Sequence, residues 1–297
     1  MSEYSDRIRI EWAASDARRD KGLCTPDNIV RYDDICYGDD SVFNRLDVYR
    51  PNERANEYLP VIISVHGGAF VYGDKELYQY YCMDLAKRGY AVINFSYRLA
   101  PEAKHPAQIE DMSNVISWMM NNADRYKLDI KNVFAVGDSA GGNLLGVYSN
   151  IYSNEDYAKL FNIEVPKGFH FNAIAINCGL LVLNDKAADC GNETDKMLND
   201  LFVNGGSEDE KKEITVTDHV TSNFPPTFIM TAQEDFLKKQ AGILATKLVE
   251  KNVPFEFRFY VDKNEVLTHV FHVDIRLISA IKCNDDECDF FKSYIVE

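Results

Sequence analysis

The chain has 297 residues, of which 46% are hydrophobic and 12% aromatic, enough for the core of one large or two small α/β domains. Its 32 Lys and Arg residues and 47 Asp and Glu residues give a net charge of −15 at pH 7. This acidity argues against nucleic acid as a partner, because nucleic-acid binding needs a basic surface.

The N-terminus and the cysteines predict a reduced, cytoplasmic protein. Residues 1–12 are charged where a secretory signal would be apolar, and no apolar run approaches the length of a membrane span. The seven cysteines are scattered and contain no C-x-x-C pair, so we expect neither a disulfide framework nor a zinc site. They are Cys24, Cys36, Cys82, Cys178, Cys190, Cys283 and Cys288.

The first half of the chain predicts one helix, an antiparallel strand pair and then alternating strands and helices. Residues 2–20 form a charged helix with a partly apolar face, and two short alternating stretches follow on either side of a Gly-Asp-Asp turn. Continuous aliphatic runs then indicate strands that are buried on both faces. The expected strands are 31–37, 45–49, 61–65, 91–95 and 133–136, and the expected helices after the first are 77–88 and 107–125.

The second half continues the alternation, with one interruption between residues 180 and 223. We expect strands at 173–177, 227–231 and 255–261, helices at 143–153 and 236–251, and one or two helices from about residue 270. This order predicts a single α/β domain over residues 1–297, with a mostly parallel, doubly wound sheet of about eight strands. Residues 1–26 and 180–223 are expected to form a small cap over its carboxyl edge.

A candidate nucleophile lies where the strand 133–136 meets the next helix. The sequence Gly137-Asp138-Ser139-Ala140-Gly141 reads G-x-S-x-G, and a serine on such a strand-to-helix turn is exposed above a helix N-terminus. The flanking glycines avoid collisions with the neighbouring backbone. Since the motif is short, an ordinary strand-to-helix turn remains an alternative unless the chain also supplies an oxyanion hole, an acid and a histidine.

Candidate oxyanion donors follow the strand 61–65, in His66-Gly67-Gly68. Paired glycines allow backbone N–H groups to face a developing oxyanion without intervening side chains. The N–H groups of Gly67 and Gly68 are therefore expected to act together with that of Ala140, the residue after the serine.

The base and the acid are expected after the last two strands, because the chain order in this kind of site is serine, acid, histidine. His269 stands where a loop turns into a helix, whereas His272, the alternative, is expected inside that helix and facing solvent or packing. The acid is expected just after the strand 227–231, where the residues alone leave Glu234 and Asp235 open.

In these motifs the chain resembles the hormone-sensitive lipase-like family of carboxylesterases, also called bacterial family IV, of the α/β-hydrolase superfamily. The resemblance runs from about residue 61 to residue 271. The matching stretches are His66–Phe70, Tyr97–Glu102, His105–Ala107, Gly137–Gly142, Asp235–Leu237 and His269–Phe271.

The resemblance implies an α/β-hydrolase fold, a catalytic triad of Ser139, Asp235 and His269, and no metal or cofactor. It places the acid at Asp235 because the family's acid stands in a D-P-L-like turn. It also implies that the two expected cap segments cover the site. The chain departs from the family pattern at Ala69, Phe236 and Val270, which stand where the family has glycine, proline and glycine; these changes affect the expected substrate range more than the expected activity.

The sequence therefore predicts a serine hydrolase that acts on small, short-chain carboxylic esters through an acyl-enzyme. An amidase or arylformamidase with the same triad is the nearest alternative, and a non-catalytic ligand receptor is a more distant one. The expected partner is a small-molecule ester, and a homodimer is left open.

Overall fold

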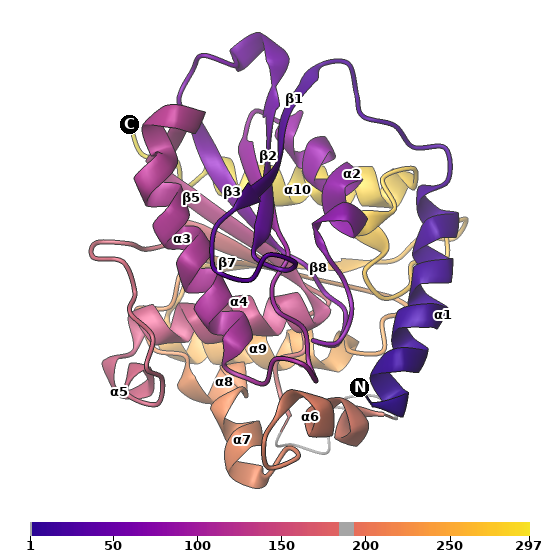
Figure 1. Ribbon diagram of the computed structural model, residues 1–297, viewed down its shortest axis with the longest axis vertical. Helices are drawn as coiled ribbons and strands as arrows, with labels where there is room; N and C mark the ends of the chain where they lie inside the picture. The colour runs from indigo at the N-terminus through magenta and orange to yellow at the C-terminus, as the bar shows by residue number, and fades with distance from the viewer. Residues whose placement is uncertain (1, 184–192) are drawn as a thin grey trace.

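The computed structural model describes residues 2–183 and 193–297 (Figure 1). Cys190 and residues 184–192 of the second expected cap segment lie outside the described residues. Eight strands form one sheet in the order β1-β2-β4-β3-β5-β6-β7-β8. The strands are β1 (Ile29–Cys36), β2 (Arg45–Pro51), β3 (Leu59–Val65), β4 (Ala91–Phe95), β5 (Leu128–Asp138), β6 (Ala173–Asn177), β7 (Thr227–Ala232) and β8 (Phe255–Tyr260).

The strand directions confirm the predicted mostly parallel sheet with an antiparallel edge. β1 pairs with β2, and β2 with β4, in antiparallel fashion. All pairings from β4 through β3, β5, β6 and β7 to β8 are parallel. The carboxyl ends of the central strands consequently meet at one edge of the sheet, where ligands bind in open α/β folds.

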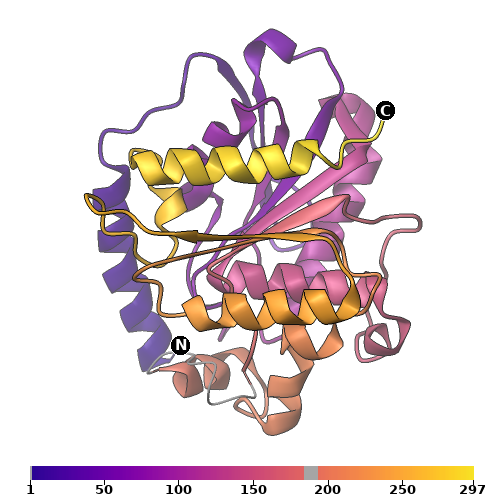
Figure 2. The ribbon, with the colours of Figure 1, turned by 180° about the vertical axis from the view of Figure 1, so that it is seen from behind.

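Helices cover both faces of the sheet, as a doubly wound fold requires. Successive strand residues point to opposite faces. Along β3, Val61 and Ile63 belong to the apolar core that also contains residues of α3, α4 and α9, whereas Ile62 belongs to the core on the other face, with residues of α2 and α10. Figure 2 shows α9 and α10 on opposite sides of the strands. The bounds are α2 (Lys75–Ala86), α3 (Ala107–Tyr126), α4 (Ser139–Ser153), α9 (Lys238–Lys251) and α10 (Ile278–Lys292).

Most boundaries lie within two residues of the sequence-based expectation, and three differences are larger or bear on the site. β5 is longer than the predicted run 133–136, because the more polar residues before it also pair with β3. Helix α4 begins at Ser139 itself, four residues before the predicted start. After β8, the chain forms a short 3₁₀ turn (Phe271–Val273) before α10, and this turn buries His272, which the sequence placed inside a helix.

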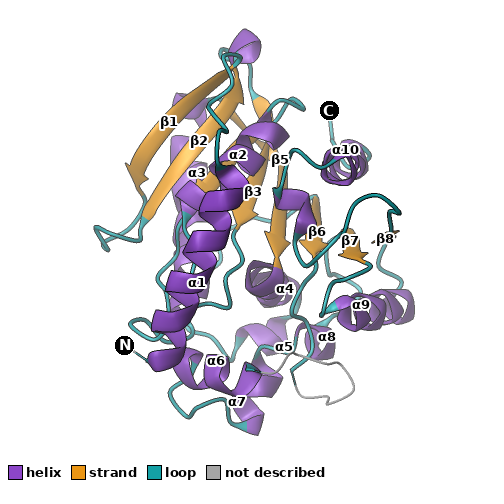
Figure 3. Cartoon of the chain, turned by 90° about the vertical axis from the view of Figure 1, so that its right-hand side faces the viewer, coloured by secondary structure: helices purple, strands orange, loops and turns teal. Residues whose placement is uncertain are grey.

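Helix α1 (Glu3–Asp20) stands at one side of the molecule, apart from the helices that cover the sheet (Figures 1 and 3). Its first turn lies beside α6 (Thr194–Leu201), where Ser2 donates to the Asp200 carboxylate and Arg7 pairs with Glu193. Between α6 and β7, the chain forms the short helices α7 (Glu208–Glu213) and α8 (Val216–His219); α5 (Glu155–Ala158) follows α4.

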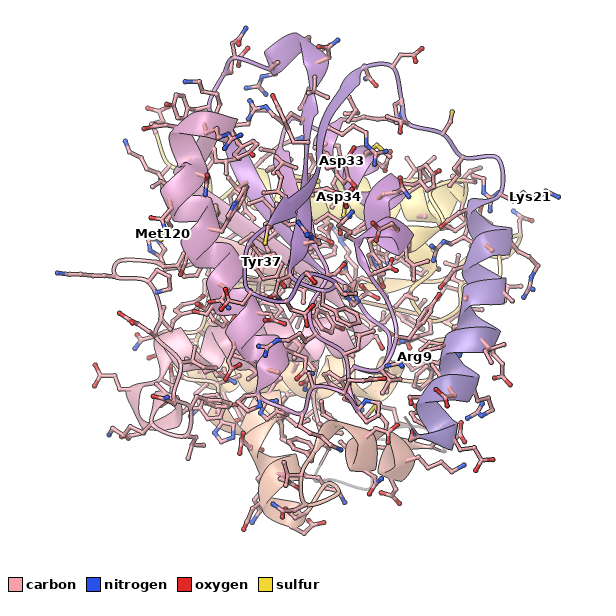
Figure 4. The ribbon with its side chains drawn as sticks, in the orientation of Figure 1. Arg9, Lys21, Asp33, Asp34, Tyr37 and Met120 are labelled. Atoms are coloured by element: carbon pink, nitrogen blue, oxygen red, sulfur yellow. The ribbon has the colours of Figure 1, made fainter. Side chains whose placement is uncertain are left out.

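Polar contacts hold α1 against the body of the chain. Arg9 forms a two-point pair with the Glu102 carboxylate, at 2.8 and 2.7 Å, and also donates to the backbone carbonyls of Val71 and Ala100. Figure 4 labels Arg9 on the side of α1 that faces the rest of the molecule. Ile8 is the one apolar side chain of α1 that is buried. None of the described helices has the length and apolar character needed to cross a bilayer.

We expect Arg9→Ala to weaken this attachment because it removes the pair with Glu102 and two hydrogen bonds to carbonyls. The free energy of unfolding should fall by about 1–2 kcal/mol. Amide hydrogen exchange should accelerate in α1 more than in the sheet. Arg18→Ala, at an exposed position of the same helix, is the control and should change neither quantity; equal effects of the two substitutions would contradict the role of Arg9.

Candidate active site

The turn between β5 and α4 holds Ser139 at the carboxyl edge of the sheet, in the direction in which the β5 arrow points in Figure 3. Ser139 has φ +52°, a left-handed conformation that costs free energy in a residue other than glycine. A Cβ at Gly141 would lie 2.1 Å from the Val65 carbonyl oxygen, and one at Gly137 would lie 2.6 Å from the Gly141 carbonyl oxygen. The two glycines are therefore required by the close approach of three backbone segments.

Asp235 and His269 meet across the loops that follow β7 and β8. The two loops join where the N–H of Glu234 donates to the carbonyl of Leu267, at 3.0 Å. His269 Nδ1 lies 2.7 Å from Asp235 Oδ1. Of the two carboxylates that the residues left open, Asp235 is buried and contacts the imidazole, whereas the side chain of Glu234 is exposed.

Hydrogen bonds keep the Asp235 carboxylate ionised despite its burial. Thr231 Oγ1 donates to Oδ2 at 2.6 Å, and the Leu237 N–H donates to Oδ1 at 3.0 Å. Burial alone would raise the pKa of Asp235, but these donors and His269 hold it below its usual value. The negative charge is therefore available to orient the imidazole and to stabilise its protonated form.

The surroundings of His269 reflect two of the departures from the family pattern. Val270 has φ +53°, a conformation that glycine would adopt without strain. The Phe236 ring lies against the imidazole, with 4.4 Å between ring centroids, while about half of its surface stays exposed. His272 is instead buried, and neither of its ring nitrogens has a hydrogen-bond partner among the described residues.

The loop after β3 differs from the expected oxyanion arrangement in one respect. The N–H of Gly67 donates to the Tyr78 hydroxyl, at 3.0 Å, and so is already engaged. The expectation that Gly67 is an oxyanion donor is therefore not supported by this geometry. Within the described chain, the N–H groups of the next two residues, Gly68 and Ala69, have no hydrogen-bond acceptor. The N–H of Ala140 lies in the first turn of α4, where backbone donors have no partner within the helix.

A cavity of about 1000 Å³ brings these groups together. Ser139, His269, Gly68, Ala69 and Ala140 all line it. Residues of α1 and α6 line it as well. The apolar and aromatic residues of the lining include Ile8, Trp12, Tyr72, Leu180, Met197, Phe236 and Val266.

Comparison with known proteins identifies the family. The model of the BD-FAE family matches residues 46–248, more than half of the chain. The chain belongs to the BD-FAE family. The matched region contains Ser139 and Asp235 with the loop after β3, whereas His269 and α1 lie outside it.

Curated relatives of this BD-FAE protein include esterases. Esterase LipC of Mycobacterium tuberculosis is 30% identical over 167 residues, which are 55% of this chain and 40% of LipC. The acetyl esterase of Salmonella paratyphi B is 27% identical over 235 residues, 75% of this chain and 68% of that enzyme. The chain thus spans less than half of LipC and 57% of a putative α/β hydrolase of Acanthamoeba polyphaga mimivirus.

Solved structures agree with the α/β-hydrolase fold. Esterase B of Lactobacillus rhamnosis superposes with a TM-score of 0.87 at 25% identity, over 97% of this chain and 94% of that one. A bacterial heroin esterase superposes with a TM-score of 0.78 at 18% identity, over 97% and 91% of the two chains, which bears on the fold alone. These relations show that the BD-FAE protein has the α/β-hydrolase fold of these solved esterases.

In the described part of the chain, Cys178, Asp235 and His269 lie close enough together to be considered as ligands of a metal ion, but their chemistry does not favour metal binding. A ligand atom of Cys178 lies within 4.8 Å of those of Asp235 and His269. Burial raises the pKa of the Cys178 thiol well above its usual value, so the thiolate that a metal prefers is disfavoured. Both oxygens of Asp235 already accept hydrogen bonds. The thiol is best described as packing beneath the acid.

Sequence reasoning did not identify Tyr78 or Ala69 as site residues. Tyr78 lies in a helix with three tyrosines within four positions, Tyr78, Tyr80 and Tyr81, and no pattern distinguishes the one that reaches the loop after β3. Ala69 was noted only as a departure from glycine. Ala69 becomes a candidate donor in place of Gly67, whose N–H is engaged by the Tyr78 hydroxyl. That hydrogen bond depends on a contact between the loop after β3 and α2, which the local sequence does not show.

We expect Thr231→Val to destabilise the protein in a pH-dependent manner, since it removes a hydrogen bond to a buried carboxylate. The folded-state pKa of Asp235 is lowered, so its stabilising contribution is present above the unfolded-state pKa and is lost as pH falls through the folded-state pKa. Urea unfolding at pH 7 should show a loss of about 1.5–3 kcal/mol. Below about pH 4, the difference in unfolding free energy between the wild-type protein and Thr231→Val should become smaller.

Thr227→Val is the matched control for this prediction. Thr227 is also buried in β7, and its hydroxyl donates to the carbonyl of Pro225 at 2.8 Å, which does not titrate. The destabilisation by Thr227→Val should therefore stay constant with pH. A constant difference for Thr231→Val as well would contradict the assigned charge of Asp235.

Proposed function

We propose that this protein hydrolyses small carboxylic esters through Ser139, His269 and Asp235. The observation that carries the proposal is the hydrogen-bonded His269–Asp235 pair in a cavity that Ser139 and free backbone donors also line. The esterase relatives support the reaction class. A non-catalytic receptor would have no need of an ionised, buried acid that is hydrogen-bonded to an imidazole at the cavity wall.

In the proposed reaction, Ser139 attacks the ester carbonyl carbon while His269 takes the hydroxyl proton. Because Asp235 holds Nδ1, the other ring nitrogen, Nε2, is the one that acts as the base. The same imidazole then donates the proton to the departing alcohol, which leaves an acyl-enzyme. Water attacks this ester in the second half of the reaction, with His269 again as the base.

We further propose that the oxyanion is bound by the N–H groups of Gly68, Ala69 and Ala140. The first two come from the loop after β3, and the third comes from the first turn of α4, whose N-terminus favours negative charge. The proposal replaces Gly67 by Ala69 because the N–H of Gly67 is engaged by Tyr78. A side chain at position 69 does not prevent this role, since the donor is the backbone.

We propose that α1 and the described parts of residues 180–223 act as a cap within a single domain. Helix α1 contributes Ile8 and Trp12 to the cavity, and α6 contributes Met197. These apolar side chains favour a neutral acyl group over a charged one. The relatives support short acyl chains: one is named acetyl esterase, and a structure of Esterase B, 25% identical with a TM-score of 0.88 over 99% of this chain and 96% of that one, has it inhibited by a tributyrin phosphonate.

Six cysteines of the described chain are unpaired, namely Cys24, Cys36, Cys82, Cys178, Cys283 and Cys288. Two of them, Cys24 and Cys36, are exposed and yet form no disulfide. Unpaired thiols are typical of proteins in reducing compartments. They support the proposal of a cytoplasmic location.

We expect Ser139→Ala to lower the hydrolysis of p-nitrophenyl acetate by at least about 10³-fold, because the nucleophile is removed. Its melting temperature should equal or exceed that of the wild-type protein, since alanine keeps the backbone of the turn. Ser153→Ala, at the far end of the same helix, is the control and should retain full activity. Turnover retained by Ser139→Ala would contradict the proposed nucleophile.

We expect kcat/KM to be highest for acetyl to butyryl esters in a series of p-nitrophenyl esters from acetate to decanoate. The wild-type enzyme should also hydrolyse these esters faster than p-nitroacetanilide or N-formylkynurenine, measured by product absorbance. Faster turnover of either amide would favour the amidase alternative, and a maximum at decanoate would contradict the short-chain proposal.

A further inference from the structure

The site contains a buried hydrogen-bond chain that the proposed reaction does not use directly. The Tyr78 hydroxyl accepts from the N–H of Gly67, at 3.0 Å, and donates to Oδ2 of Asp138, at 2.7 Å. Tyr78 and Asp138 are exposed by only 8% and 3%, so these hydrogen bonds are largely shielded from bulk solvent. One phenol therefore connects the loop after β3 to the residue that directly precedes Ser139.

The two connected segments are the two halves of the proposed oxyanion site. β3 and β5 are paired up to Val65 and Gly137, and backbone pairing between them ends there. Gly67 and Asp138 lie just beyond that point. No backbone hydrogen bond joins the two segments beyond that point, and Tyr78 supplies the one hydrogen-bonded bridge between Gly67 and Asp138 among the described residues.

The loop after β3 is also strained, so contacts with the surrounding residues are needed to hold its conformation. Ala69 and Phe70 have φ values of +52° and +62°, which are uncommon for residues other than glycine. Such conformations persist where surrounding contacts determine them. A Cβ at Gly67 would lie 2.6 Å from Oδ2 of Asp138 and 3.2 Å from the Tyr78 hydroxyl oxygen, so the loop is packed directly against the bridge.

Helix α2 gives the bridge a rigid base. The Asp74 carboxylate caps the helix by accepting from the N–H of Leu77, one residue before Tyr78. Cys82, Met83 and Leu85 of α2 are fully buried against the sheet. The phenol is consequently held by an element that does not belong to either half of the oxyanion site.

We propose that Tyr78 is a positioning residue that sets the distance between the N–H groups of Gly68 and Ala69 and that of Ala140. This inference rests on the proposed esterase function and adds a residue to it. Tyr78 acts through the backbone and does not touch the reacting atoms. The bridge keeps the donors in place before the oxyanion forms, so its contribution belongs to the transition state and not to substrate binding.

The proposal requires Asp138 to be an acceptor. Burial raises the pKa of Asp138 to about 6, while the hydrogen bond from Tyr78 and the positive charges of Arg19 and protonated His269 oppose the shift. At neutral pH the carboxylate is ionised and accepts the phenolic proton. The pKa of Tyr78 is raised well above its usual value, by burial and then by this carboxylate, so the phenol stays protonated as the donor.

The test compares Tyr78→Phe with Tyr81→Phe in the full-length protein. Tyr81 is one turn further along α2, is fully buried, and also donates to a buried carboxylate, that of Glu287, at 3.1 Å, but it does not reach the oxyanion loop. Tyr78→Phe should lower kcat for p-nitrophenyl acetate by about 10–100-fold with KM within about twofold of wild type. Tyr81→Phe should lower the melting temperature about as much as Tyr78→Phe does, while its kcat stays within about threefold of the wild-type value.

A trifluoromethyl ketone, which forms an oxyanion with the serine, separates positioning from general damage. Its inhibition constant should rise in Tyr78→Phe by the same factor by which kcat/KM falls, and it should not change in Tyr81→Phe. Asp138→Asn, which keeps an acceptor oxygen for Tyr78, should lose less activity than Tyr78→Phe. If Tyr78→Phe does not fold, Asp138→Ala, which removes the acceptor of the phenol, should lower kcat with KM within about twofold of wild type, and an unchanged kcat would overturn the inference.

Three further outcomes would overturn the inference: an unchanged kcat in folded Tyr78→Phe, equal losses in Tyr78→Phe and Tyr81→Phe, or a larger loss in Asp138→Asn than in Tyr78→Phe. The last would assign the effect to the charge of Asp138 and not to the bridge. An inactive wild-type protein would instead contradict the proposed esterase function, so the two failures are distinguishable.

Discussion

The close approach of three backbone segments at Gly141 is the constraint on which the rest of the site depends. The end of β3, the end of β5 and the first turn of α4 meet with so little space that a single methyl group at Gly141 would overlap the Val65 carbonyl. This contact places the helix N-terminus beside the loop after β3. Ser139 and the proposed oxyanion donors stand on the segments that meet there, and the Tyr78 bridge joins two of these segments just beyond the contact.

The proposed acid and base, Asp235 and His269, are organised in a different way, by hydrogen bonds between loops. Asp235 is buried at the end of β7, where Thr231 and the Leu237 N–H compensate its charge. His269 reaches it from the loop after β8 because the adjacent backbones pair at Glu234 and Leu267. The Asp235 carboxylate is held by Thr231 of β7 through one oxygen and orients the His269 imidazole through the other. The second nitrogen of the imidazole, Nε2, is therefore free to face the cavity.

Much of this architecture could be predicted from the sequence because its determinants are local. Aliphatic runs marked the strands, and G-x-S-x-G at a strand end marked the serine. The choice between Glu234 and Asp235 needed a family resemblance, because burial of one carboxylate depends on how the loops after β7 and β8 meet. The engagement of Gly67 could not be predicted, since Tyr78 is 11 positions away in a helix and two neighbouring tyrosines share its local pattern.

Helix α1 differs from the rest of the site in the kind of contact that fixes it. It lines the cavity but buries a single apolar side chain, and its polar contacts with the rest of the chain include the ion pairs of Arg9 with Glu102 and of Arg7 with Glu193. Around Ser139, by contrast, the ends of β3 and β5 and the first turn of α4 approach so closely that a Cβ at Gly137 or Gly141 would overlap the neighbouring backbone. The surface proposed to select the substrate can therefore diverge in sequence one exposed residue at a time, while the surface proposed to perform the reaction tolerates almost no change in shape. A fold built in this way can acquire new substrates without rebuilding its catalytic centre.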